Sequence, residues 1–332
     1  MKKGETALGI RLLPDINRGK RWGKKARAMV FSVFRILVLL AIGFVILYPL
    51  LYMVVTSLRT KNSFLNSARI WIPEEIAFLK NYSMAFDFLD YGNSMLSTLK
   101  LEVVSALIEV AACAVAAYGF SRFRFRGRKL LTAMLFLTIL VPDTMIIIPR
   151  VVNYSHMDFL GILGLFNQLT GVDLRPNLLG TPFAFYFPSL LANGLRSGIM
   201  IFIYIQFFKN LPNELEEAAW IDGAGPFRTF ISVAIPSSGV VILTVLVFSL
   251  IWHWNDYFLA SMYMNKDYPL AVSLNMMPDL LTTQGYYIGA SQAESMAFLM
   301  AACVMFVLPM LIVYMILQRW FIESIDRVGI TG

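Results

Sequence analysis

Uncharged apolar stretches long enough to cross a lipid bilayer constrain this chain more than any other feature. A helix needs roughly 20 mostly apolar residues to span the hydrocarbon core. Ile36–Val55 and Ser295–Leu317 meet this length, and Thr229–Trp254 contains a third such run. Charged residues make up only 15% of the chain, against about 25% in typical soluble domains. The sequence therefore predicts an all-α, polytopic membrane protein, because it holds too few polar groups to cover a water-facing surface.

Three further candidate spans are interrupted by polar residues. They are Met95–Tyr118, which carries Glu102 and Glu109; Leu130–Ile148, which carries Asp143; and Phe183–Phe208, which is broken near Asn193, Gly194 and Arg196. Together with the first three, they predict a bundle of six transmembrane helices over residues 31–320. A basic segment, residues 1–30, precedes this bundle, and a short tail, residues 321–332, follows it.

Basic residues indicate how the predicted spans are oriented. Lysine and arginine concentrate in the cytoplasmic loops of membrane proteins. The segment before the first span is rich in both, and Arg122–Lys129 holds five basic residues and no acidic one. Six spans with both termini in the cytoplasm satisfy this distribution. The net charge of +7 is thus explained by topology and by attraction to anionic membrane lipid, and nucleic-acid binding is not expected.

The cytoplasmic loop at residues 209–236, between the fourth and fifth spans, breaks this basic pattern. It carries four acidic residues and two basic ones. An anionic inner leaflet repels a net-acidic loop, so we expect the loop to face a protein. Pro212 and Asn213 resemble a helix start, and Glu216 follows at the spacing of a capping box. Gly223 is expected to end this helix, and Gly225-Pro226 to force a turn before a second short one.

Small residues give this predicted helix a narrow face. Ala218 and Asp222, and likewise Ala219 and Gly223, are four residues apart and therefore neighbours on the helix surface. Such a face lets another protein surface approach closely. A capped connector with no partner explains the composition equally well.

The loop also carries a long set of residues at fixed spacing. The set is Glu217-Ala218-Ala219, Asp222-Gly223-Ala224, Phe230, Ile235 and Pro236. It resembles the EAA motif of ABC importer permeases, although Ser237-Ser238-Gly239 stands where many relatives have a second proline. The resemblance implies a coupling helix that docks into a cleft of a cytoplasmic ATPase. The residues it assigns to ATPase coupling are Glu216, Glu217, Ala218, Ala219, Asp222, Gly223 and Ala224.

Further motifs extend the resemblance over nearly the whole chain after the basic N-terminus. They include Asn81-Tyr82, Asn93-Ser94, Ala116-Ala117-Tyr118, Ile148-Pro149, Trp254-Asn255-Asp256 and Gln318-Arg319. They are similar to the carbohydrate-importer subfamily, and to its shorter, six-span, maltose-transporter-type subunit. The resemblance implies a type I ABC importer transmembrane fold in a bacterial-type cytoplasmic (inner) membrane. It also implies a heterodimer with a second homologous permease, a dimer of cytoplasmic ABC ATPases and an extracytoplasmic solute-binding protein.

Catalytic and metal-binding patterns are missing from the sequence. No G-x-x-x-x-G-K-[S/T] phosphate-binding loop occurs, so the chain is not expected to bind nucleotide or to be an enzyme. ATP and Mg are expected on partner ATPase subunits. His156 and His253 do not pair with cysteine or a carboxylate at metal-ligand spacing, and no metal site is expected. Cys113 and Cys303 are interpreted as small buried apolar residues.

Four polar or aromatic residues in the spans are candidates for the translocation path. Ionisable groups at membrane depth are costly unless they face a cavity or a partner. Three roles are open for Glu109: it binds sugar hydroxyls, it pairs with a basic group on another helix, or it is protonated. A structural bond between helices explains its presence at least as well as a role in binding solute. Asn255 and Asp256 lie beside Trp254, whose ring suits stacking on sugars; an aromatic belt at the membrane interface is the favoured explanation. For Asp143 a structural role is favoured.

Two outer loops are informative in outline. Thr60–Tyr91 is long and polar and is expected to form interfacial helices. Asn167–Thr181 is longer than the family resemblance leads us to expect, and we expect it to enlarge the contact with an external binding protein.

The leading interpretation is a permease subunit that couples ATPase movements to alternating access through its EAA-loop helix. The alternative is a stand-alone ion-coupled secondary transporter, which Glu109 and Asp143 support but for which no inverted repeat is visible. A membrane scaffold explains neither the acidic loop nor its small-residue face. The solute stays open among linear oligosaccharide, monosaccharide, polyol and a non-sugar compound.

Overall fold

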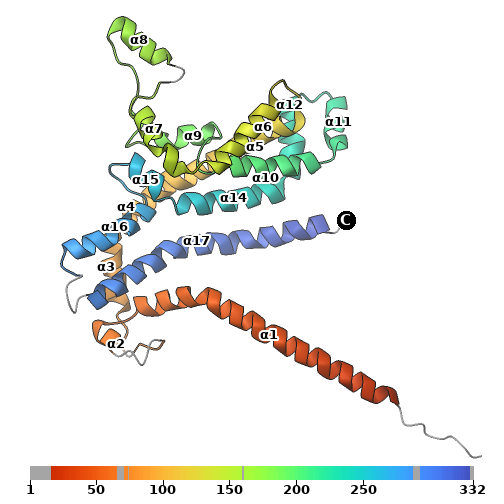
Figure 1. The fold of residues 1–332 in the computed structure, drawn as a ribbon, viewed down its shortest axis with the longest axis vertical. Helices are drawn as coiled ribbons and strands as arrows, with labels where there is room; N and C mark the ends of the chain where they lie inside the picture. The colour runs from red at the N-terminus through yellow and green to blue at the C-terminus, as the bar shows by residue number, and fades with distance from the viewer. Residues whose placement is uncertain (1–15, 66–70, 74, 159–160, 287–291, 330–332) are drawn as a thin grey trace, which may run out of the picture.

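The described part of the chain folds into helices and contains no β-sheet. The structure is a computed structural model, and it describes residues 16–65, 71–73, 75–158, 161–286 and 292–329. Within these ranges the only β-bridge joins Arg59 and Ile76. Figure 1 shows α5, α6, α10 and α14 running side by side, with α17 and then α1 lying on one flank. The predicted all-α class is confirmed.

The helices of the central bundle are arranged around α5. They are α4 (Tyr91–Thr98), the π-helical η1 (Leu99–Val103), α5 (Val104–Arg122), α6 (Arg128–Leu140), α7 (Asp143–Ser155), α9 (Phe183–Leu190), α10 (Ser197–Asn210), α14 (Gly239–Trp254) and α17 (Gln292–Gly329). α10, α14 and α9 all pack on α5, and α17 packs on α14.

The remaining helices flank or connect this bundle. They are α1 (Ile16–Ser57), α2 (Lys61–Leu65), α3 (Phe78–Leu89), α8 (Ile162–Thr170), α11 (Asn213–Ile221), α12 (Pro226–Thr229), the π-helical η2 (Phe230–Ala234), α13 (Ile235–Ser237), α15 (Phe258–Tyr263) and α16 (Leu270–Thr283). α2 and α3 confirm that the predicted long polar loop at Thr60–Tyr91 forms helices, although part of it lies outside the described residues.

The number of membrane crossings is only partly settled by helix length. In the described part of the chain, three helices are long and apolar enough to span: Arg27–Ser57, Tyr91–Arg122 and Gln292–Trp320. Two bent pairs raise this to five, with bends of 103° between α6 and α7 and 82° before α14. The remaining predicted span is divided between α9 and α10, each shorter than the roughly 20 residues needed. The six-span count therefore stays a prediction.

The break between α9 and α10 occurs at the predicted place. Ala192 and Arg196 have φ angles of +52° and +59°, a left-handed conformation that residues with a Cβ rarely adopt. Asn193 and Gly194 lie between them, so the chain turns sharply before α10 begins at Ser197.

Small side chains let α5 approach its neighbours closely. Cys113, Ala114 and Ala117 are buried in one apolar cluster with Tyr204 and Phe208 of α10. Small residues at helix contacts are typical of membrane bundles, because packing must replace the missing hydrophobic driving force. The expectation that Cys113 is a small buried residue is confirmed, and Cys303 is half-buried and free.

Both ends of the described chain and the α11 loop lie toward the same end of the molecule. Figure 1 shows the start of α1, the α11 helix and the C-terminal end of α17 on the right of the view. Most of α1 is exposed along its apolar length and contacts mainly α17. A single chain therefore leaves a long apolar helix for lipid or another subunit to cover.

Candidate functional site: the α11 loop and the polar interior of the bundle

The α11 helix ends as the sequence predicts. α11 runs from Asn213 to Ile221, and Gly223 follows with φ +81°. The Ala224 amide donates to the Ala219 carbonyl at 2.9 Å, and the Gly223 amide to the Trp220 carbonyl at 3.0 Å. These bonds close the helix with a left-handed glycine, which carries no Cβ to oppose that conformation. The predicted turn and second short helix are also present, as α12.

The predicted capping box at the start of α11 is wrong. Pro212 occupies the N-cap position, and no side chain caps the helix. The two residues that were expected to cap each other both accept hydrogen bonds from Arg122 instead. Its Nε donates to Glu216 at 2.9 Å, and its Nη1 to Asn213 at 2.6 Å. A third bond joins Nη2 to the Leu211 carbonyl at 2.8 Å.

These three bonds, which we name the Arg122 tether, attach α11 to the end of α5. The Arg122 side chain is 11% exposed and the Glu216 side chain 2%. Partly buried guanidinium bonds to a carboxylate hold their geometry far better than exposed pairs. Glu216 is therefore engaged within the chain. Sequence reasoning took Arg122 as a topology signal and as part of the family resemblance, and it did not predict these bonds to the α11 region.

The other predicted coupling residues lie on the surface of the α11 loop. Glu217, Ala218, Asp222 and Gly223 are exposed, and Ala219 and Ala224 are half-buried. Large apolar side chains that the sequence reasoning missed are exposed around them. These are Leu215, Trp220, Ile221 and Phe227. An apolar patch of this kind on a loop is typical of a protein contact surface.

A buried polar network fixes Glu109. His253 of α14 lies between two carboxylates of the α5 side, with Nε2 2.7 Å from Glu109 and Nδ1 3.2 Å from Glu102. The Ser197 hydroxyl donates to the other oxygen of Glu109. All four side chains are buried. Both oxygens of Glu109 are thus engaged in interhelical bonds, which was one of the predicted explanations.

His253 was missed by sequence reasoning, which sought partners only at metal-ligand spacing. One signal was available: Glu102 and Glu109 are seven residues apart, which is close to two helical turns and puts them on one face. In the described residues no group of three or more His, Cys, Asp or Glu side chains has the arrangement of a metal site.

Gly194 is required by the close approach of the same network. A Cβ at this position would lie 2.9 Å from the Glu109 carboxyl carbon and 2.8 Å from the Ser189 hydroxyl. Such distances are shorter than van der Waals contact, so any other residue must displace a buried bonded side chain.

The remaining predicted path residues make contacts within the chain. The Trp254 indole N–H donates to the Phe306 carbonyl at 3.2 Å and its ring packs against Phe306, which commits it to the α14–α17 contact. Asp256 is buried and accepts the Leu259 amide at 3.1 Å, at the start of α15. Asn255 is exposed and donates to the Ile251 carbonyl. A path role therefore stays a prediction, with Asn255 the exposed member of the three.

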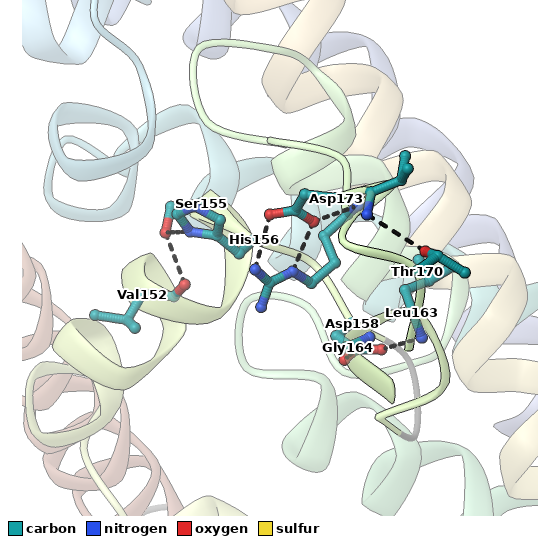
Figure 2. Close-up of polar contacts among 10 residues, drawn as sticks. Val152, Ser155, His156, Asp158, Leu163, Gly164, Thr170 and Asp173 are labelled. Carbon is teal, nitrogen blue, oxygen red and sulfur yellow. Dashed lines mark hydrogen bonds and ion pairs between the residues drawn. The ribbon is translucent and has the colours of Figure 1, made fainter. Parts of the chain in front are cut away.

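The outer excursion, of which the structure describes residues 156–158 and 161–181, is held by hydrogen bonds of its own (Figure 2). The Asp158 carboxylate accepts the amides of Leu163 and Gly164, at 3.0 and 2.8 Å, at the start of α8. Arg175 donates to both oxygens of Asp173, at 2.8 and 2.7 Å. These hydrogen bonds hold the pKa of the Asp173 carboxyl well below its ordinary range.

Backbone bonds fasten this excursion to the bundle. The Met157 amide donates to the Pro176 carbonyl at 3.0 Å, which closes the base of the excursion. The Leu178 amide donates to the backbone carbonyl of Tyr154 in α7 at 2.8 Å. The Gly180 amide donates to the backbone carbonyl of Tyr263 in α15 at 2.7 Å. α8 projects beyond this base, away from the bundle (Figure 1).

The comparisons with known proteins agree with this architecture. The family of binding-protein-dependent transport system inner membrane components matches residues 110–327. The diacetylchitobiose uptake system permease protein of Streptomyces coelicolor is 31% identical over 85% of this chain and 83% of its own length. The melibiose/raffinose/stachyose import permease protein of Bacillus subtilis is 26% identical over 86% and 91%.

A solved structure shares the fold. A chain of a bacterial ABC transporter involved in the import of the acidic polysaccharide alginate superposes with a TM-score of 0.66. It is 21% identical, over 88% of this chain and 97% of that chain.

These findings define the class of protein: a multi-pass membrane permease of the ABC importer type. The chain belongs to the family of binding-protein-dependent transport system inner membrane components. The relatives that match it are named as transport permeases rather than enzymes.

Replacing His253 by leucine is expected to destabilise the folded bundle by about 3–5 kcal/mol, because it leaves two buried carboxylates without their partner. Thermal unfolding of the purified protein in detergent measures the change. His156→Leu is the matched control, since His156 is exposed and bonds only to Ser155. Equal unfolding temperatures for the two variants would show that the network contributes little.

Arg122→Lys keeps the positive charge but loses the planar fork that bonds three groups. Each bond to a charged group contributes about 1.5–3 kcal/mol, so we expect the amides of α11 to exchange with deuterium at least tenfold faster. Hydrogen exchange followed by mass spectrometry measures this. Arg124→Lys, at an exposed position two residues away, should leave α11 unchanged; if both variants behave alike, the tether does not hold the helix.

Proposed function

We propose that the chain is a permease subunit of an ATP-driven importer for a carbohydrate or oligosaccharide, and that α11 couples ATPase movements to alternating access. One observation carries the proposal: an exposed apolar and small-residue surface on α11 is attached by the Arg122 tether to the central helix α5. The printed names of the two matched permeases, for diacetylchitobiose and for melibiose, raffinose and stachyose, support a sugar as the solute.

The proposed partners follow from what one chain leaves uncovered. ATP and Mg belong to a dimer of separate ABC ATPases, which contacts the exposed α11 surface. A second homologous permease covers α1, whose apolar length is exposed here. An external solute-binding protein delivers the solute, and the family description itself names binding-protein-dependent transport.

Force applied to α11 has a continuous route into the bundle. The Arg122 tether passes it to the end of α5. α5 packs directly on α10 and α14, and the His253 network joins α5 to α14 and to the start of α10. Closely packed helices move as rigid bodies rather than deform. Inward movement of α11 therefore rotates α5, α10 and α14 together between outward-open and inward-open states.

The proposed orientation places α11 and both chain ends in the cytoplasm. All three lie toward one end of the molecule in Figure 1, and the basic residues of the N-terminal segment and of Arg122–Lys129 favour that side. The outer excursion then faces the external solution, where the binding protein arrives.

The two carboxylates that suggested an ion-coupled secondary transporter are both engaged within the chain. Glu109 is engaged by Ser197 and His253, and Asp143 pairs with Arg150 at 3.5 Å. Both carboxylates thus have partners within the chain, and the match to a family of binding-protein-dependent transport components does not favour this alternative.

The function is tested by uptake in proteoliposomes that contain the chain with its co-purified subunits. Uptake of radiolabelled sugar is expected to require ATP and binding protein and to persist with a protonophore. Ala219→Trp should abolish it, because a bulky ring prevents close approach to the ATPase, while assembly persists. Met134→Trp, at an exposed position on α6, is the control. Protonophore-sensitive uptake without ATP would exclude the proposal.

The outer excursion is tested by replacing residues 159–175 with a short Gly-Ser linker. Leu178 and Gly180 keep their bonds to the bundle in this design. The concentration of binding protein that half-saturates ATPase stimulation is expected to rise at least fivefold, because contact surface is lost. Assembly and basal ATPase activity should be unchanged. An unaltered half-saturation would separate the excursion from binding-protein contact.

A further inference from the structure

A pocket lies where two broken helices face each other. Its volume is about 730 Å³, and it is lined by the end of α6, the start of α7 and the break between α9 and α10. Its charged and amide-bearing lining residues are Asp143, Arg150, Asn193 and Arg196. Breaks of this kind build the solute sites of many transporters, because they expose backbone groups inside the bundle.

The charge of this lining is positive. Two arginines face one aspartate, and Arg150 already pairs with Asp143 at 3.5 Å. The guanidinium of Arg196 lies 5.4 Å from the centre of the Trp252 ring, and the described residues provide it with no carboxylate. Arg196 is exposed in the single chain, and it interrupts the predicted Phe183–Phe208 span, where a charged group marks a solute pathway unless it is neutralised.

Helix ends add to the positive potential. α7 begins at Asp143 and α10 at Ser197, so both present N-terminal turns to the pocket. An N-terminus carries about half a positive charge and favours an anion. At the N-terminus of α7, the Asp143 carboxylate supplies the negative charge. At α10 the N-cap residue is Arg196, a cation, which is the opposite of what a helix N-terminus favours.

Arg196 is also held in an unfavourable backbone conformation, with φ +59°. A left-handed residue with a Cβ costs about 1–3 kcal/mol and persists where the surroundings fix it, often at functional sites. An anion bound between the guanidinium and the first amides of α10 would satisfy both charges at once. The electrostatics of the pocket therefore favour an anion.

We propose that this pocket binds the acidic group, carboxylate or phosphate, of an anionic carbohydrate, with Arg196 as its main ligand. The proposal rests on the proposed importer function and narrows its solute class. Arg150, Asn193 and Gly194 also line a smaller adjoining cavity that reaches His253 and Asp256. This cavity of about 20 Å³ is too small for a sugar ring, so of these residues only Arg150 and Asn193, which also line the main pocket, supply donors and acceptors for sugar hydroxyls.

The electrostatic potential of the pocket can be measured with charged thiol reagents, even though the solute is not identified. Asn193→Cys is placed in a chain with Cys113→Ala and Cys303→Ala, purified with its partner subunits. Rates of modification are compared for a sulfonate-bearing and a trimethylammonium-bearing methanethiosulfonate. The anionic-to-cationic rate ratio is expected to be at least tenfold higher than for Gln168→Cys, because α8 carries no charged residue. Equal ratios overturn the proposal.

The contribution of Arg196 is isolated by two variants in the Asn193→Cys background. Arg196→Gln removes one positive charge, which slows the anionic reagent and speeds the cationic one, so the ratio should fall about tenfold. Arg196→Lys keeps the charge and should keep the ratio. A ratio that Arg196→Gln leaves unchanged overturns the assignment to Arg196. If Arg196→Gln fails to assemble, the comparison with Gln168→Cys still decides.

Protection by solutes tests the ligand and separates its two sources. Alginate pentasaccharide supplies carboxylates, glycerol 3-phosphate supplies a phosphate, and maltopentaose is the uncharged control. At least one anionic solute should slow modification of the Asn193→Cys thiol fivefold or more, and maltopentaose should not. Equal protection by maltopentaose, or none by either anion, overturns the proposal. So does a thiol that reacts with neither reagent, because the second permease would then fill the pocket.

These outcomes are independent of the importer function itself. If uptake proves independent of ATP while the rate ratio remains high, the importer proposal fails and the anion site stands. If uptake is ATP-driven and the ratio equals that of the control, the anion site fails alone.

Discussion

The attachment of the α11 loop to the bundle depends on the guanidinium of Arg122. Arg122 ends α5 and bonds three groups of the α11 region, two side chains and one carbonyl. Without these bonds, a nine-residue helix would be marginal in water, because helices of this length do not fold alone. The tether thus gives the helix both its stability and its mechanical connection. An exposed apolar patch on a loosely attached loop would bind a partner without moving the bundle.

The same helix, α5, holds the polar interior. It carries the small residues that pack on α10, and it also carries Glu109, which bonds to α10 and α14. Close packing and buried ionic bonds therefore converge on one element. Breaking a buried pair is costly, so the three helices are expected to move together rather than separate. Under the proposed coupling, this cohesion carries a displacement of α11 to α10 and α14.

Local features of the fold were predictable from the sequence, and long-range ones were not. Gly223, Gly225 and Pro226 fix helix ends and turns through their own backbone preferences, so the α11 loop was placed correctly. The capping box failed because Arg122, about ninety residues earlier, offers a stronger donor than a helix amide. His253 was missed for the same reason: its carboxylate partners lie about 150 residues away, and spacing along the chain carries no trace of that contact.

The break between α9 and α10 contacts both the buried Glu109 network, at Gly194, and the pocket, at Arg196. Gly194 is there because the Glu109 network leaves no room for a Cβ, and this is a requirement of the interior. Arg196, two residues on, lines the pocket, and its guanidinium lies over the Trp252 ring rather than against a carboxylate. A purely structural break would be satisfied by any small polar residue after the glycine. The left-handed arginine at a helix N-terminus is therefore better explained by what enters the pocket than by what holds the bundle together.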